Sequence, residues 1–274
     1  MAEKISKVKK IEYAEKSTEL KKQIDELNKH IQEMLKSLSS SGALINYKKV
    51  IIANLYMNII MLYIKLSNLS MDILGIKNES YLENARKLSY KFISILEDIV
   101  GNYVDVPYSE MKDKLATISQ LDDIKRLKLV KKISYSVSMM EEAFGPNSKW
   151  KWSFVDLDAR AANLCKNLTD YKRIQENQDP RVEGFPERNE LLKFIKIYIR
   201  KAADRLREKY EIANPDVIIL KEAIKYLAAL MRIAITFNDG DEANNLKKNI
   251  KIWEEKLEQD EKKLDEEKKK KLKK

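Results

Sequence analysis

Residues 50–64 read VIIANLYMNIIMLYI, an uncharged run that is apolar on nearly every side of a helix. The run is shorter than the ~20 residues that a bilayer requires, it contains Asn54 and Asn58, and it continues directly into Lys65. We therefore expect a buried central helix over about residues 44–74 rather than a membrane span. A helix that is apolar all round must be surrounded by other helices, which the rest of the chain is expected to supply.

Glycine and proline are scarce, six and five in 274 residues, so the chain has few places to turn. The long stretches between them carry apolar residues at helical spacing. This pattern predicts an all-α protein, either an elongated multi-helix bundle or a stack of antiparallel helical hairpins, with coiled-coil-like terminal helices. We expect four sections: an N-terminal amphipathic helix (1–41), a helical core (42–145), a second helical section (146–252) and a charged C-terminal helix or tail (253–274).

One helical hairpin has a weak resemblance to a known repeat family. Residues 226–253 contain the turn Asn238-Asp239-Gly240-Asp241 followed by Glu242-Ala243, which resembles a tetratricopeptide hairpin and would imply a peptide-binding adaptor. The family's Trp, Leu-Gly, Tyr and closing Pro positions are mostly unmatched, and no regular ~34-residue period emerges. The choice between a bundle and a helical-repeat stack therefore stays open.

Several polar residues are expected to begin helices or to lie in their first turn. Ser80 and Glu83 have the spacing of a capping box. Asp156 and Asp158 suit the first turn of a helix, where the helix dipole favours acids. Asn214-Pro215 combines a favoured N-cap with proline at the first helical position. Beyond Leu257 apolar residues thin out, so we expect the end of the chain to be a solvated helix that frays into disorder.

The composition excludes most catalytic and metal sites. The chain has a single histidine, His30, and a single cysteine, Cys165. His30 between Glu26 and Glu33 superficially resembles a carboxylate-bridged metal site, but such sites need further histidines from facing helices. We expect Cys165 to be a small buried hydrophobe rather than a nucleophile. We expect no enzyme, no cofactor, no bound metal and no small-molecule substrate.

An apolar seam marks the N-terminal helix as a candidate partner-binding surface. Its residues alternate spacings of four and three, as in a coiled coil: Leu20, Ile24, Leu27, Ile31, Met34 and Leu38. The seam can pack on the protein's own bundle or on a partner helix, and the spacing does not choose between them.

The segment Lys149-Trp150-Lys151-Trp152 interleaves cations with aromatic rings. Such a pattern suits nucleic-acid stacking, a membrane interface or a protein hot spot, so Trp150 and Trp152 are candidate partner-binding residues. The alternative is that one tryptophan staples the following helix to the core, with Ser153 as its N-cap. We favour the second interpretation.

The segment Lys193–Lys209 carries seven cations against Asp204 and Glu208. Four of them recur at helical spacing and are candidate anion-binding residues: Lys193, Lys196, Arg200 and Arg207. Such stripes can track phosphates, but most charge runs on helices are simply the solvated face. A second cluster, Lys125, Lys128 and Lys132, has the same character.

These features favour a binding or scaffolding function. One cysteine, abundant lysine and no apolar leader among the first ten residues predict a cytoplasmic setting. We expect a non-enzymatic helical scaffold or adaptor that self-associates or joins a larger protein assembly. The alternative is a binder of anionic surfaces, nucleic acid or acidic lipid, which uses the Lys193–Lys209 face and the Lys-rich tail under a net charge of +10.

Overall fold

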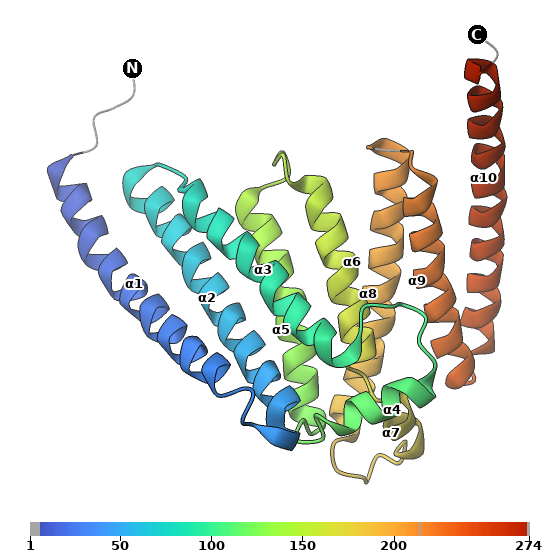
Figure 1. Cartoon of the computed structure of the whole chain (residues 1–274), viewed down its shortest axis with the longest axis horizontal. Helices are drawn as coiled ribbons and strands as arrows, with labels where there is room; N and C mark the ends of the chain where they lie inside the picture. The colour runs from blue at the N-terminus through green and yellow to red at the C-terminus, as the bar shows by residue number, and fades with distance from the viewer. Residues whose placement is uncertain (1–5, 214, 273–274) are drawn as a thin grey trace. The chain divides into compact units, whose positions relative to one another are not determined.

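The computed structural model describes residues 6–213 and 215–272. Within these residues the chain forms α-helices with no strand between them, which confirms the all-α prediction (Figure 1). In chain order the elements are α1 (Lys7–Lys36), the 3-10 turn η1 (Gly42–Leu44), α2 (Ile45–Leu74), α3 (Glu79–Val100), α4 (Tyr108–Ala116), α5 (Asp123–Phe144), α6 (Lys151–Asn167), α7 (Tyr171–Glu176), α8 (Phe185–Ile212), α9 (Val217–Thr236) and α10 (Gly240–Leu272).

The helices gather into two compact units. The first comprises Met1–Gly101 and Met111–Lys151, and the second comprises Asn102–Glu110 and Trp152–Lys274. The segment that contains the start of α4 therefore packs with the second unit although the first unit surrounds it in sequence.

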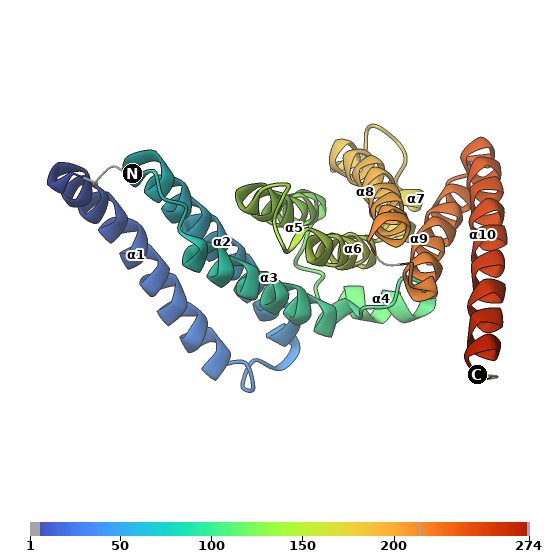
Figure 2. The same ribbon diagram turned by 90° about the horizontal axis from the view of Figure 1, so that it is seen from above.

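In the first unit α2 is the central helix, in contact with α1, α3 and α5 (Figure 2). Its inward side chains, among them Ile52, Met57 and Ile60, are fully buried. By length and composition Gly42–Leu74 is also the one stretch of the described chain apolar enough to cross a membrane, and 56% of its most apolar window is buried. The helical neighbours expected from its sequence are therefore present around it.

The two asparagines of α2 have a partner on α5. Lys132 donates hydrogen bonds to the side-chain oxygens of both Asn54 and Asn58, each at 2.6 Å. Asn54 and Asn58 lie one turn apart, so one ammonium group can reach both. Burial lowers the pKa of Lys132 from its usual value. Lys132, which the sequence groups with Lys125 and Lys128, therefore connects α5 to α2.

The N-terminal seam packs on α2. Ile24 and Ile31 are buried, and α1 and α2 are neighbours. Leu20, Leu27 and Met34 are half-buried along the same helix. The inner half of the seam is thus covered by the protein's own fold.

Three expected helix starts were wrong, in each case by a few residues. Asn78, not Ser80, caps α3, because its side chain accepts the backbone N–H of Ser80 at 3.2 Å. Asp216 caps α9 by accepting the N–H of Ile218 at 2.9 Å, so the helix begins after Pro215; Asn214 lies outside the described residues.

The third misplaced start is that of α6. This helix begins at Lys151, and the hydroxyl of Ser148 accepts the N–H of Trp150 at 3.1 Å, so Ser153 lies inside the helix. Asp156 and Asp158 consequently lie beyond the first turn, where the helix dipole no longer explains them.

The C-terminal helix is longer and better anchored than the sequence suggested. α10 is helical as far as Leu272, where fraying was expected. Trp253 is buried, the Tyr210 hydroxyl of α8 donates a hydrogen bond to Asp260, and Lys221 of α9 pairs with Glu261 at 2.6 Å. These contacts hold α10 on α8 and α9.

Candidate functional site

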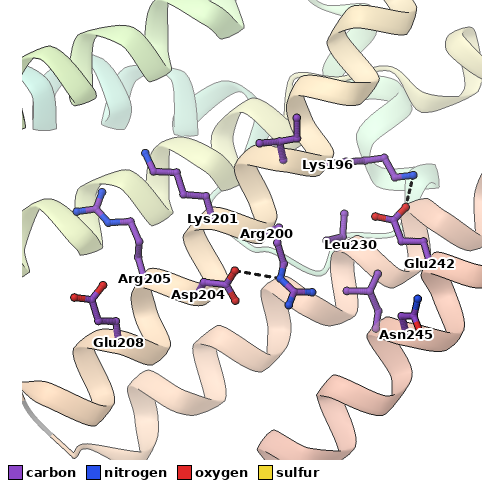
Figure 3. A pocket seen from close by; sticks show the side chains of 11 residues that line it. Lys196, Arg200, Lys201, Asp204, Arg205, Glu208, Leu230, Glu242 and Asn245 are labelled. Atoms are coloured by element: carbon purple, nitrogen blue, oxygen red, sulfur yellow. Dashed lines mark hydrogen bonds and ion pairs between the residues drawn. The ribbon is translucent and has the colours of Figure 1, made fainter.

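The basic face predicted on α8 borders a groove within the second unit (Figure 3). We call it the α8–α10 groove; its volume is about 770 Å³. Residues of α8, α9 and α10 line it: Lys196, Ile197, Arg200, Lys201, Asp204, Arg205, Glu208, Leu230, Glu242, Asn245 and Leu246. Two of the four predicted anion-binding residues, Lys196 and Arg200, are in this lining.

Lys196 connects α8 to the start of α10. Its ammonium group pairs with Glu242 (Figure 3) and with Asp239, the latter at 3.0 Å. Although burial opposes the charged form, hydrogen bonds to Glu242 and Asp239 raise the pKa of Lys196 above its usual value. The same contact with Lys196 lowers the pKa of Asp239. Lys196 is therefore neutralised by two acids of its own chain.

Two more of the predicted cations also have internal partners. Arg200 pairs with Asp204 one turn along α8 at 3.1 Å, as Figure 3 shows. Arg207 pairs with Glu211 at 2.7 Å, and its guanidinium lies 5.0 Å from the centre of the Trp253 ring. Lys193 is exposed and has no ion pair within the described part of the chain. Most of the predicted basic face is thus compensated.

Beside the groove lies the carboxylate of Asp158, a residue whose sequence context predicts the first turn of a helix. Asp158 of α6 is only 2% exposed. It accepts a hydrogen bond from Tyr198 at 2.8 Å and one from Arg205 at 2.7 Å, and Lys201 lies at 3.3 Å. A buried charge is tolerated only with such partners, because taking it out of water is costly. Asp158 therefore fixes the positions of Arg205 and Lys201 at this end of the groove.

The groove also has an apolar part. Leu230 and Leu246 are buried beneath it, whereas Ile197 on its wall is 70% exposed. The groove therefore combines paired charges with one exposed apolar side chain on its wall.

The two predicted tryptophans are half-buried rather than fully exposed. The guanidinium of Arg86, on α3, lies 3.8 Å from the centre of the Trp150 ring. Trp152 lies inside α6. Trp150 therefore packs against Arg86 of its own unit. Because Ser153 lies inside α6, it is not the N-cap that the staple interpretation requires.

The comparisons with known proteins give a family. Residues 9–261 match the TP0443 family. The chain belongs to the TP0443 family. No curated protein matches it in sequence. A solved structure from the computational design of self-assembling cyclic protein homo-oligomers is 15% identical, over 89% of this chain and 98% of that one, with a TM-score of 0.27. That likeness is too low to bear on the fold or assembly of this TP0443 family member.

The single cysteine and the single histidine of this TP0443 family member lie in different environments. Cys165 is buried, and burial, with the nearby charge of Asp158, raises the pKa of its thiol well above the usual value. Such a thiol is a poor nucleophile. His30 is exposed on α1 beside Glu26 and Leu27. Across the described residues no group of three or more His, Cys, Asp or Glu side chains is arranged to hold a metal ion.

Proposed function

We propose that this protein is a non-enzymatic, cytoplasmic helical scaffold, and that the α8–α10 groove holds a partner protein. The observation that carries the proposal is Ile197, a large apolar side chain 70% exposed on the wall of a groove of about 770 Å³. Burying such a side chain in a partner contributes about 1.5–3 kcal/mol. Helical grooves that bind proteins use anchors of this kind.

The pairing of the charges supports a protein rather than a phosphate-bearing partner. Lys196, Arg200, Lys201 and Arg205 each have a carboxylate partner on this chain. A phosphate would have to displace these acids, whereas an amphipathic helix can bury Ile197 and leave the ion pairs at the rim. Rim charges of this kind set orientation and association rate more than affinity.

A matched pair of variants tests this role. Ile197→Arg places a charge on the groove wall, and Ile218→Arg makes the same change on α9 at a side chain 68% exposed outside the groove lining. We expect Ile197→Arg to lose the proteins that copurify with the wild type, and Ile218→Arg to retain them. Equal copurification by both variants would contradict the assignment of the groove.

The net charge of +10 favours the second candidate, an anionic-surface binder. It is tested by Arg200→Glu with Arg207→Glu. If the face tracks phosphates, each lost contact lowers the salt slope on duplex DNA by about 0.9. We expect weak binding or none at physiological ionic strength. Submicromolar affinity that the double variant abolishes would promote this candidate above the scaffold.

A further inference from the structure

A second groove lies between α9 and α10, lined by residues different from those of the α8–α10 groove. We call it the α9–α10 groove; its volume is about 650 Å³. Its lining is Met231, Asn244, Lys247, Lys248, Ile250, Lys251 and Glu254. The two grooves share no lining residue, so a partner of one need not contact the other.

The α9 wall of this groove belongs to an apolar stripe. Ile224, Ala228, Met231 and Ile235 follow one another at spacings of four, three and four, which places them on one face of α9. The first three are half-buried and Ile235 is 58% exposed. α10 adds the half-buried Ile250 to the lining. An incompletely covered stripe at this spacing matches the anchors of a second helix laid into the groove.

The α10 wall is basic and largely uncompensated. Lys247 and Lys248 are exposed and have no ion pair among the described residues. Lys251 lies 3.9 Å from Glu255, at the limit of an ion pair, and both side chains are mostly exposed. Glu254 is the single acid in the lining. Lys247 and Lys248, with the weakly paired Lys251, therefore present positive charge beside an apolar stripe, and the fold neutralises it only in part.

We propose that the α9–α10 groove binds an amphipathic helix of another protein whose apolar stripe is flanked by aspartate or glutamate. The apolar stripe of α9 supplies the surface that such a helix buries, and the three lysines of α10 supply the complementary charge. The apolar wall is unsuited to a phosphate backbone, which is polar along its whole length. The groove is concave, and a helix fills it better than a flat bilayer surface.

The experiment uses two synthetic helical peptides of about 18 residues, or five turns. Both carry leucine at spacings of three and four; one is flanked by glutamate and the other by lysine. Fluorescence anisotropy measures their affinity for the full-length protein. We expect the glutamate peptide to bind at least about 10-fold more tightly than the lysine peptide, because only its charge complements the groove.

Reversing the charge of the three groove lysines then tests whether the peptide binds in the α9–α10 groove. The triple variant Lys247→Glu, Lys248→Glu, Lys251→Glu is expected to lose the glutamate peptide and to bind the lysine peptide instead. Lys91→Glu, a change at another exposed lysine, on α3, is the control and should leave both affinities unchanged. Met231→Arg should weaken binding of the glutamate peptide through the apolar wall. Circular dichroism verifies that each variant remains helical.

Several results would overturn the proposal. The first is equal affinity of the wild-type protein for the two peptides. This result would contradict the proposal even if the triple variant did not fold. Others are a triple variant that binds the glutamate peptide as the wild type does, or tighter binding to anionic phospholipid vesicles or duplex DNA than to the peptide. Self-association that the triple variant abolishes would assign the groove to a second copy of this chain. None of these results bears on Ile197, so the scaffold role of the α8–α10 groove stands or fails separately.

Discussion

The two grooves beside α10 are built from similar residue types and differ in how their cations are paired. In the α8–α10 groove Lys196 and Arg205 contact Glu242 and Asp158 respectively. In the α9–α10 groove Lys247 and Lys248 form no ion pair with an acid of the described chain. A cation with an internal partner contributes to the fold, whereas an exposed unpaired one remains available to an outside partner. A basic stripe is therefore informative only once the positions of the acids are known.

The largest effect on stability is expected at Asp158, the buried carboxylate beside the α8–α10 groove. Asp158→Ala would leave Arg205 and Tyr198 without their buried carboxylate, and we expect a loss of about 3–5 kcal/mol in the free energy of unfolding, measured by urea denaturation. Asp156→Ala is the control: it removes an exposed acid 2.6 Å from Lys209 and should cost about 0–1 kcal/mol. Equal losses would show that the buried pairing of Asp158 does not stabilise the α8–α10 groove.

A charge reversal at the rim of the same groove comes next. Lys196→Glu would place a third carboxylate beside Asp239 and Glu242, and we expect it to lower the free energy of unfolding by about 1–2 kcal/mol. Lys193→Glu, on the same helix but unpaired, should change it by about 0.5 kcal/mol or less. If the two variants unfold at the same urea concentration, Lys196 does not fasten α8 to α10.

The third prediction concerns acid stability. Hydrogen bonds from Lys256 and Tyr210 lower the pKa of Asp260 to about 2, below the ~3.9 of an unfolded aspartate. The ionised carboxylate therefore contributes stability above about pH 4, and this contribution is lost as the pH falls towards 2.

We accordingly expect Asp260→Asn to be about 1 kcal/mol less stable than the wild type at neutral pH and to lose less on acidification from about pH 4 to 2. Asp265→Asn, exposed further along α10, should follow the wild-type curve. Parallel urea unfolding series at several pH values make the comparison. An unchanged acid slope for Asp260→Asn would mean that Asp260 does not fasten α10 to the α8 side.

The smallest effect on stability is expected in the α9–α10 groove. Lys247→Glu and Lys248→Glu should each change the free energy of unfolding by about 0.5 kcal/mol or less, because neither lysine has a partner to lose. Thermal unfolding followed by circular dichroism measures this. A loss as large as that of Lys196→Glu would show that these lysines stabilise the fold, and the contrast between the grooves would disappear.

The helices themselves were predictable because their signals are local. Gly75, Gly101 and Gly145 end helices with φ of 67°, 83° and 85°, a region that favours glycine. The N-caps were less certain because cap-forming residues cluster: Asn78 and Ser80 lie two residues apart, and the sequence does not rank them.

The candidate site was only half predictable. Helical spacing located Lys196 and Arg200 on one face of a helix, but Asp239 lies 43 residues from Lys196. Asp158 likewise lies 47 residues before Arg205, and no local pattern joins such residues. One signal was present: Asp158 interrupts an inward apolar stripe with Leu157 and Ala161, and a charged residue at such a position needs a buried partner.

The hydrogen bonds from Lys132 to α2 can form only well after α2 itself has been synthesised. Asn54 and Asn58 precede Lys132 by 78 and 74 residues. At a synthesis rate of about 5–20 residues per second, Lys132 is added roughly 4–15 s after the two asparagines. α3 follows α2 directly in the chain. The nascent chain can therefore cover one side of α2 with α3 early, whereas the side of α2 that faces α5 is covered only after Lys132 has been synthesised.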